Sequence, residues 1–165
     1  MADSIPELIM ALSEKGSMMD ELLKLLEEEH RLIVKLDTAN LETQMGKTRE
    51  LFVRLERSGN LSRQLMKQLA AELGLPEAAG LSPLLPKVAL PHRKTLMELQ
   101  RKLLETGAAL DHLMAFNREL LYGALRTVNR SLEFFGHLFS RSTTYGKAGQ
   151  MLGAAPHARI ICKEI

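Results

Sequence analysis

The sequence has little of what β-sheets, disulfide-linked folds and membrane spans require. Tryptophan is absent, aromatic residues make up 4% of the 165 residues, and leucine recurs throughout, so helix is favoured over sheet. The single cysteine, Cys162, cannot form an internal disulfide, which fits a reducing compartment. No apolar run reaches the length of about 18 residues that a span needs, and the N-terminus begins with acidic residues and Pro6. We therefore predict an all-α, cytoplasmic protein with no cleaved signal and no stable membrane insertion.

The sequence also lacks the paired residues that catalytic and metal sites need. Glu27 and His30 have the Glu-x-x-His spacing of di-iron bundles, but such a site needs a second pair. No other histidine has a glutamate three residues before it. No Gly-x-Ser-x-Gly motif occurs, and Cys162 has no base held beside it. We expect a solvated His30, no metal, no cofactor and no enzyme activity.

Charge is nearly balanced overall but is uneven along the chain. The 22 basic and 20 acidic side chains give a net charge of +2. Residues 1–29 contain eight acids and two lysines, which sum to −6, so the remainder carries +8. This positive charge is interspersed along the chain instead of forming a block, so we expect no nucleic-acid partner.

Apolar residues in the first half repeat at the spacing of a helix. Residues 5–13 form a mobile arm or a brief helix that ends near Gly16, and a long arm then covers residues 17–73. The first apolar stripe of this arm contains Leu22, Leu26, Ile33 and Leu36, with residues 27–29 on the solvent face. A kink at residues 37–40 shifts the stripe, and the helix continues across residues 58–60.

The second half is a connection, a long helix and a tail. Pro76, Pro83, Pro86 and Pro91 exclude a long helix from residues 74–91, whose apolar Leu84, Leu85, Val88 and Leu90 are available to pack on the bundle end. The next helix covers residues 92–140, and a flexible tail covers residues 142–165. We predict one all-α domain, residues 1–141. Its fold is an elongated antiparallel helical hairpin or coiled-coil bundle with two or three long helices.

The long second-half helix has more apolar surface than one partner helix covers. Beside its main seam it carries a second stripe of Leu113, Phe116, Leu120, Ala124, Phe134 and Leu138. Either further helices of the same chain bury this stripe, or it is left for a protein ligand. Asn117 lies on the main seam and likewise has two interpretations, as a residue that fixes helix register or as a hydrogen-bonding group for a partner.

The most specific motif lies near the end of the sequence. It begins with Asn117-Arg118-Glu119-Leu120-Leu121, continues through Ala124-Leu125 and Leu132, and closes with Thr144-Tyr145-Gly146-x-x-Gly149. This segment resembles the C-terminal signature of the FlgN family of flagellar export chaperones. Over residues 17–150 the order of parts is similar as well, although the family's second asparagine, three residues after the first, is Leu120 here.

The resemblance implies a binding protein without catalytic chemistry. Its expected partners are hook-associated (hook-filament junction) subunits, whose C-terminal helical ends it would keep from aggregating and deliver to the flagellar type III export apparatus. The expected client-binding residues are Asn117, Leu120, Leu121, Leu125, Val128, Leu132, Phe135 and Leu138. Tyr145 is expected either to dock on the export gate or to pack back on Phe139.

Two other functions stay open at this point. One is a structural or regulatory coiled-coil module that self-associates through the same stripe, as a possible homodimer, and has no client. The other is a helical nucleic-acid regulator, which predicts steeply salt-dependent binding to DNA or RNA. Neither accounts for the Tyr-Gly-x-x-Gly tail.

Overall fold

The computed structural model describes residues 4–76 and 80–141, which contain three long helices. These are α1 (Ser4–Lys35), α2 (Thr38–Glu72) and α3 (Leu90–Arg141), and a short 3-10 helix, η1 (Leu85–Lys87), precedes α3. The described residues contain no strand, so the predicted all-α helical hairpin bundle is confirmed. The predicted tail, residues 142–165, lies outside them. The chain divides into two compact units, residues 1–121 and 122–165, which we describe in turn.

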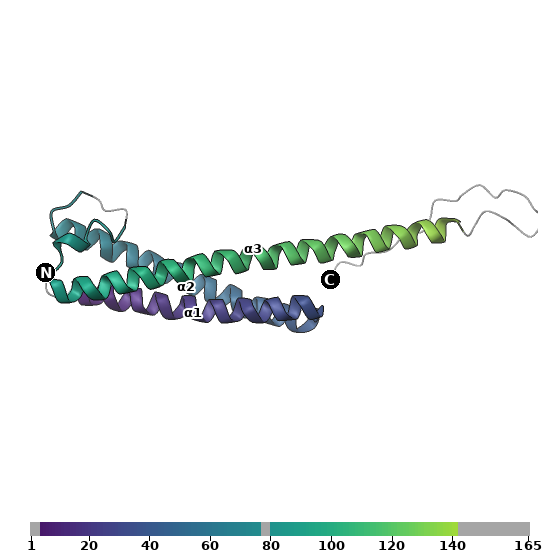
Figure 1. Ribbon diagram of the computed structural model, residues 1–165, viewed down its shortest axis with the longest axis horizontal. Coiled ribbons are helices and arrows are strands. Elements are labelled where there is room, and N and C mark those ends of the chain that lie inside the picture. The colour runs from purple at the N-terminus through teal and green to yellow at the C-terminus, as the bar shows by residue number, and fades with distance from the viewer. Residues whose placement is uncertain (1–3, 77–79, 142–165) are drawn as a thin grey trace, which may run out of the picture. The chain divides into compact units, whose positions relative to one another are not determined.

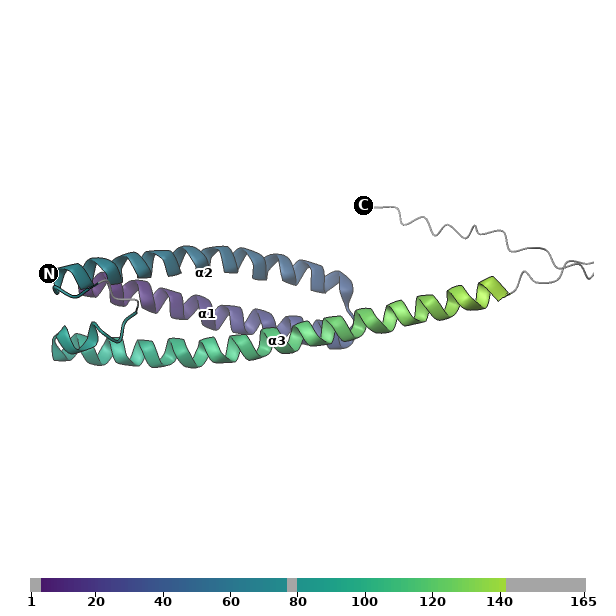
Figure 2. The same cartoon turned by 90° about the horizontal axis from the view of Figure 1, so that it is seen from above.

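The first unit is a bundle in which α1 and α3 run in the same direction and α2 runs in the opposite one (Figures 1 and 2). Two apolar clusters hold the three helices together. One contains Leu8, Leu69, Leu84 and Leu96 among its buried residues, and the other contains Leu22, Leu26, Leu51 and Leu110. Each cluster draws on all three helices, so the burial of these side chains accounts for most of the stability of the bundle.

The first helix begins earlier than the sequence predicts. The expected brief helix before Gly16 is the first part of α1, which continues through that glycine. Gly16 is buried, and a Cβ built there would lie 3.7 Å from Leu103 Cδ2 on α3. Gly107 on α3 is its counterpart, since a Cβ there would lie 3.6 Å from Met19 Cε. These glycines therefore sit where α1 and α3 approach each other, and Gly16 does not end a helix.

The expected kink at residues 37–40 is wrong, because the chain reverses there and α2 packs back on α1. Leu36 has a φ of 55°, and the N–H groups of Leu36 and Asp37 donate to the carbonyls of Ile33 and Leu32. This is a Schellman motif with leucine in the place that glycine usually takes. Asp37 then caps α2 by accepting from the backbone N–H of Asn40. The arm predicted over residues 17–73 is therefore two antiparallel helices.

The second helix agrees with prediction in its middle and at its end. It continues through Ser58, Gly59 and Asn60, as expected. It ends in a second Schellman motif, in which Gly74 has a φ of 65° and donates to Ala71 O while Leu75 donates to Ala70 O.

The connection to α3 packs on the end of the bundle. Leu81, Leu84 and Val88 are buried in the first apolar cluster, and Leu85 packs against it. Arg93 of α3 donates to the carbonyls of Pro86 and Val88, which fixes the connection on the first turns of the helix. The prediction of packing is confirmed for Leu84, Leu85 and Val88, but Leu90 is 66% exposed because it already belongs to the first turn of α3.

No described helix is both long enough and apolar enough to cross a lipid bilayer.

Candidate protein-binding surfaces

Asn117 of α3 is the last fully buried residue of that helix in the first unit. Its amide nitrogen donates to Leu26 O at 2.9 Å, and its amide oxygen lies 3.0 Å from His30 Nδ1. The oxygen can only accept, so His30 Nδ1 carries the proton in this contact. The side chain is 4% exposed. Both polar atoms of the Asn117 amide thus hydrogen-bond to α1. Such a pair of bonds fixes the register of α3 against α1.

His30 is not the solvated side chain that the sequence predicts. Its ring is half-buried and stacks on Phe116 of α3, with ring centroids 5.1 Å apart and an interplanar angle of 24°. Among the described residues no three His, Cys, Asp or Glu side chains gather in a way that could hold a metal ion. His30 therefore serves as a packing and hydrogen-bonding partner of α3.

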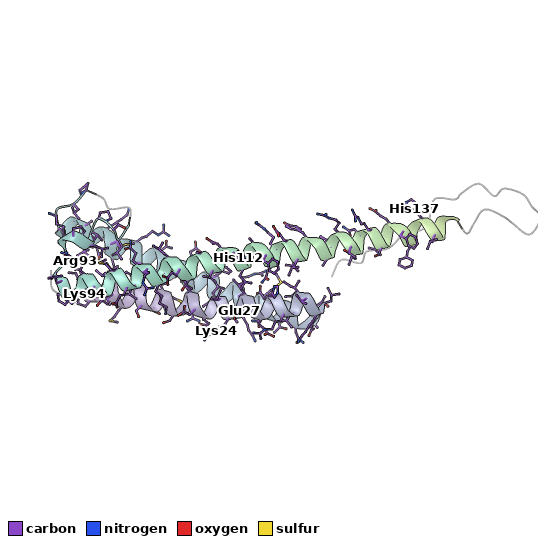
Figure 3. All side chains as sticks on the ribbon, viewed as in Figure 1. Lys24, Glu27, Arg93, Lys94, His112 and His137 are labelled. Atoms are coloured by element: carbon purple, nitrogen blue, oxygen red, sulfur yellow. The ribbon has the colours of Figure 1, made fainter. Side chains whose placement is uncertain are left out.

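A polar layer joins α1 to α2 at the same level. Thr48 of α2 donates to Glu29 of α1, and Gln44 donates to Leu25 O at 3.3 Å. Glu29, Gln44 and Thr48 are all at most 8% exposed. The expected solvent face of residues 27–29 holds for Glu27, which lies on the outer side of α1 (Figure 3), but is wrong for Glu29. A buried carboxylate needs a donor, and Thr48 supplies it.

At this polar layer the bundle opens into a groove between α2 and α3. The groove encloses about 600 Å³, within the range of ligand-binding pockets. Its floor is Leu26 and Glu29 of α1; its walls are Met45, Thr48, Arg49 and Phe52 of α2 and Asp111, Met114, Ala115, Asn117, Arg118 and Leu121 of α3. The large apolar side chains Met45, Phe52, Met114 and Leu121 remain 37–43% exposed. These side chains contact water in the free protein, and covering them would be favourable in free energy.

The described part of the second unit, residues 122–141, is the rest of α3. Its apolar residues follow helical spacing, yet the large ones between residues 125 and 138 are all close to half exposed or more. These are Leu125 at 56%, Val128 at 55%, Leu132 at 59%, Phe134 at 60%, Phe135 at 52% and Leu138 at 49%. Phe134 and Phe135 contact each other edge to face, with centroids 5.7 Å apart. A helix with such a stripe lacks the partner that would normally bury it.

The predicted client-binding residues divide between the two units. Asn117 is buried in the bundle, Leu120 is half-buried and Leu121 is 38% exposed. The remaining five are the exposed apolar residues of the second unit, Leu125, Val128, Leu132, Phe135 and Leu138. Tyr145 lies outside the described residues.

The second stripe divides in the same way. Leu113 packs against an apolar cluster of the bundle, and Phe116 stacks on His30 but remains 45% exposed, whereas Phe134 and Leu138 are 60% and 49% exposed. Other helices of the same chain therefore cover Leu113 and only part of Phe116.

Sequence reasoning missed the groove. The heptad pattern places Met45 and Phe52 on the seam of α2 and Met114 on that of α3, which predicts burial for all three. Burial fails because the adjacent side chains that face α1, Thr48 and Asn117, are polar and are used in contacts with that helix. Polar residues on a seam, flanked by large apolar ones, are the signal that could have indicated an open site.

Taken together, a helical bundle with an apolar groove and a helix with an exposed apolar stripe define a protein-binding module. The comparison with known families is more specific, because the family described as FlgN protein matches residues 1–153. The chain belongs to the FlgN family. It is therefore a flagellar export chaperone, a class of binding proteins and not of enzymes. No curated protein and no solved structure matches the chain.

Proposed function

We propose that this chaperone binds the C-terminal helical ends of hook-associated subunits through the exposed stripe of Leu125, Val128, Leu132, Phe135 and Leu138. The observation that supports this most is the exposure of the whole stripe, 49–59% for every member. In water such a stripe is costly, and an amphipathic client helix would cover it while hiding its own apolar side. The client is thereby kept from aggregating in the cytoplasm until export.

The softness of this segment suits a releasable complex. Gly123 and Gly136 have open space around them, so no close packing requires a glycine there. Each lowers the intrinsic stability of the helix by about 1 kcal/mol relative to alanine. When a segment becomes ordered on binding, the loss of conformational entropy offsets part of the favourable contact free energy. The affinity therefore stays moderate.

The test is the double variant Leu125→Asp with Leu132→Asp, titrated calorimetrically with synthetic C-terminal peptides of the hook-filament junction proteins of the same organism. The wild-type chain should bind saturably at 1:1 with a large negative heat-capacity change. The double variant should lose binding by at least about 100-fold and keep its helical circular dichroism, because both positions are exposed.

A matched control is Thr127→Asp with Asn129→Asp, at exposed polar positions of the same helix segment. It adds the same charge without touching the stripe and should leave the affinity within about threefold. If the Leu125/Leu132 variant binds as tightly as the wild type, the stripe is not the client site.

Tyr145 is proposed to dock the loaded chaperone on the export apparatus, by analogy with the family. Tyr145→Ala should therefore leave client binding unchanged and reduce secretion of the client. Unchanged secretion would remove this role.

A further inference from the structure

The groove of the first unit carries two arginines without partners. Arg49 on α2 and Arg118 on α3 line opposite walls, are exposed, and have no ion pair or hydrogen bond within the described structure. Their neighbours Thr48 and Asn117 bond to Glu29 and Leu26, one helical turn apart on α1. The two guanidinium groups therefore lie at similar heights along the bundle, on either side of the groove.

The acidic residues of the groove do not neutralise these two arginines. Glu29 is buried in the floor and accepts from Thr48. Asp111 is exposed, but it lies seven residues before Arg118, about two turns away along α3. The groove is thus basic in its middle, at Arg49 and Arg118, and apolar on either side. Because α2 and α3 run in opposite directions, Met45 and Leu121 lie at one end, and Phe52 and Met114 lie toward the other end, near Asp111.

Residues 122–165, the part of the chain outside the bundle, fit such a groove poorly. Residues 122–141 have an apolar stripe but contain three arginines and one glutamate. Residues 142–165 contain Lys147, Arg159 and Lys163 against Glu164. Either segment, from the same or a second copy, would bring more positive charge to Arg49 and Arg118, and like charges at a contact are unfavourable.

We propose that the groove is a second docking site for the client, and that it takes an amphipathic helix with one or more carboxylates beside its apolar side. The carboxylates pair with Arg49 and Arg118, and the apolar side covers Met45, Phe52 and Met114. A helix is the fitting shape because the walls and floor are themselves three helices, and a fourth completes a four-helix arrangement. This inference rests on the proposed function, to which it adds a contact on the bundle and a charge requirement for the client.

The first experiment reverses the charge of the two groove arginines. The full chain with Arg49→Glu and Arg118→Glu is titrated with the wild-type client peptide and with a peptide whose acidic residues are replaced by lysine. The variant should bind the wild-type peptide about tenfold or more weakly than the unmodified chain does. It should prefer the lysine peptide, since attraction across the groove is restored.

The control for this variant is Arg54→Glu with Arg57→Glu, which are also on α2. Both arginines are exposed and neither lines the groove. The net charge changes by the same amount, so a general effect of charge would weaken binding equally in both variants. Only the groove variant should lose affinity.

The second experiment fills the groove without changing charge. Ala115→Trp places an indole among the lining residues, and Ala109→Trp places one at an exposed position of α3 outside the groove. The first should lower client affinity about tenfold, the second by less than about twofold. Both should keep the wild-type circular dichroism and midpoint of thermal unfolding.

The outcomes separate the two proposals. Weaker binding in both groove variants, with rescue by the lysine peptide, supports the second site. Unchanged binding in them, with loss in the Leu125/Leu132 variant, overturns the groove and leaves the proposed function standing. A wild-type dimer that Ala115→Trp dissociates also overturns it, because the occupant is then a second copy. Failure of the wild-type chain to bind any junction-protein peptide removes both.

Discussion

The two parts of α3 have similar sequences and very different surroundings. In residues 90–121 the seam leucines Leu96 and Leu110 are at most 5% exposed, whereas Leu125 and Leu132 in residues 122–141 are more than half exposed. Both parts repeat apolar residues at steps of three and four. The pattern therefore indicates which face of a helix needs a partner, but it does not say whether the partner is in the same chain.

This difference is what a chaperone needs from one helix. Under the proposed function, packed residues hold a rigid structure, while the exposed apolar residues contribute binding free energy when a client covers them. The polar contacts near the end of the bundle are consistent with this division, because the side-chain amide of Asn117 makes its hydrogen bonds with α1.

The largest expected effect is the difference between two leucine truncations. Leu22→Ala removes a side chain that is 1% exposed in the bundle and should lower the free energy of unfolding by about 2–5 kcal/mol. Leu132→Ala removes one that is 59% exposed and should cost less than about 0.5 kcal/mol. Urea denaturation of the two variants measures both. A comparable cost at Leu132 would mean that the stripe is already covered in the free protein, and the comparison would fail.

A smaller effect is expected from a pair of asparagines. Asn117→Ala removes two buried hydrogen bonds between α1 and α3 and should cost about 1–3 kcal/mol. Asn129→Ala changes an exposed residue of the second unit and should be within about 0.5 kcal/mol of the wild type. Hydrogen exchange should show that Asn117→Ala loosens α3 around that residue. Equal stability of the two variants would show that Asn117 does not fix α3 on α1.

Much of the fold follows from the sequence because helical periodicity reports local geometry. The predicted seam of the third helix is buried at Leu96, Leu110 and Asn117, though not at Met114. The packing of Leu84 and Val88 follows from their place in a proline-rich connection that cannot form a long helix. The continuity of α2 through Gly59 is also predicted, since the seam keeps its phase there.

The parts that the sequence did not predict depend on tertiary context. The reversal at Leu36 has no glycine or proline to mark it, and only the Asp37 to Asn40 cap offered a signal. The groove depends on which helix Thr48 and Asn117 contact, and a pattern of residue types does not carry that information. The burial of Glu29 is a further case, because its donor lies 19 residues away.

The next prediction concerns the turns that end α1 and α2, where two substitutions should change the free energy of unfolding in opposite directions. Leu36 is 71% exposed with a φ of 55°, so Leu36→Gly relieves backbone strain and loses little packing. After the greater flexibility of glycine in the unfolded chain is subtracted, we expect a gain of about 0.5–1 kcal/mol. Gly74→Ala should lose about 1 kcal/mol, since a Cβ there meets nothing but the φ of 65° is unfavourable.

Thermal unfolding and hydrogen exchange measure this pair. Both substitutions should alter the protection of bundle amides from hydrogen exchange and leave the exchange of residues 122–141 unchanged. The two units would then differ clearly in their response. A loss of stability in Leu36→Gly would show that the leucine side chain contributes to the reversal in some way other than its backbone conformation.

The smallest effect concerns the pH dependence of the α2 cap. The hydrogen bonds from the side chain and the backbone N–H of Asn40 lower the pKa of the Asp37 carboxyl below its ordinary value near 3.8. A carboxyl whose pKa is lower in the folded state stabilises the fold above its unfolded pKa, and this stabilisation is lost as pH falls through the folded pKa. Asp37→Ala should therefore unfold at a lower temperature than the wild type at pH 6, with a gap that shrinks below about pH 4.

Asn40→Ala is the matched variant, because it removes the side-chain donor and keeps the backbone donor and the carboxylate. Its gap from the wild type should be smaller than that of Asp37→Ala and should shrink over the same acidic range. A gap that stays constant from pH 6 to pH 3 would mean that the capping aspartate acts through backbone conformation instead of charge. The reversal between α1 and α2 would then depend on Leu36 and the packing of the two helices alone.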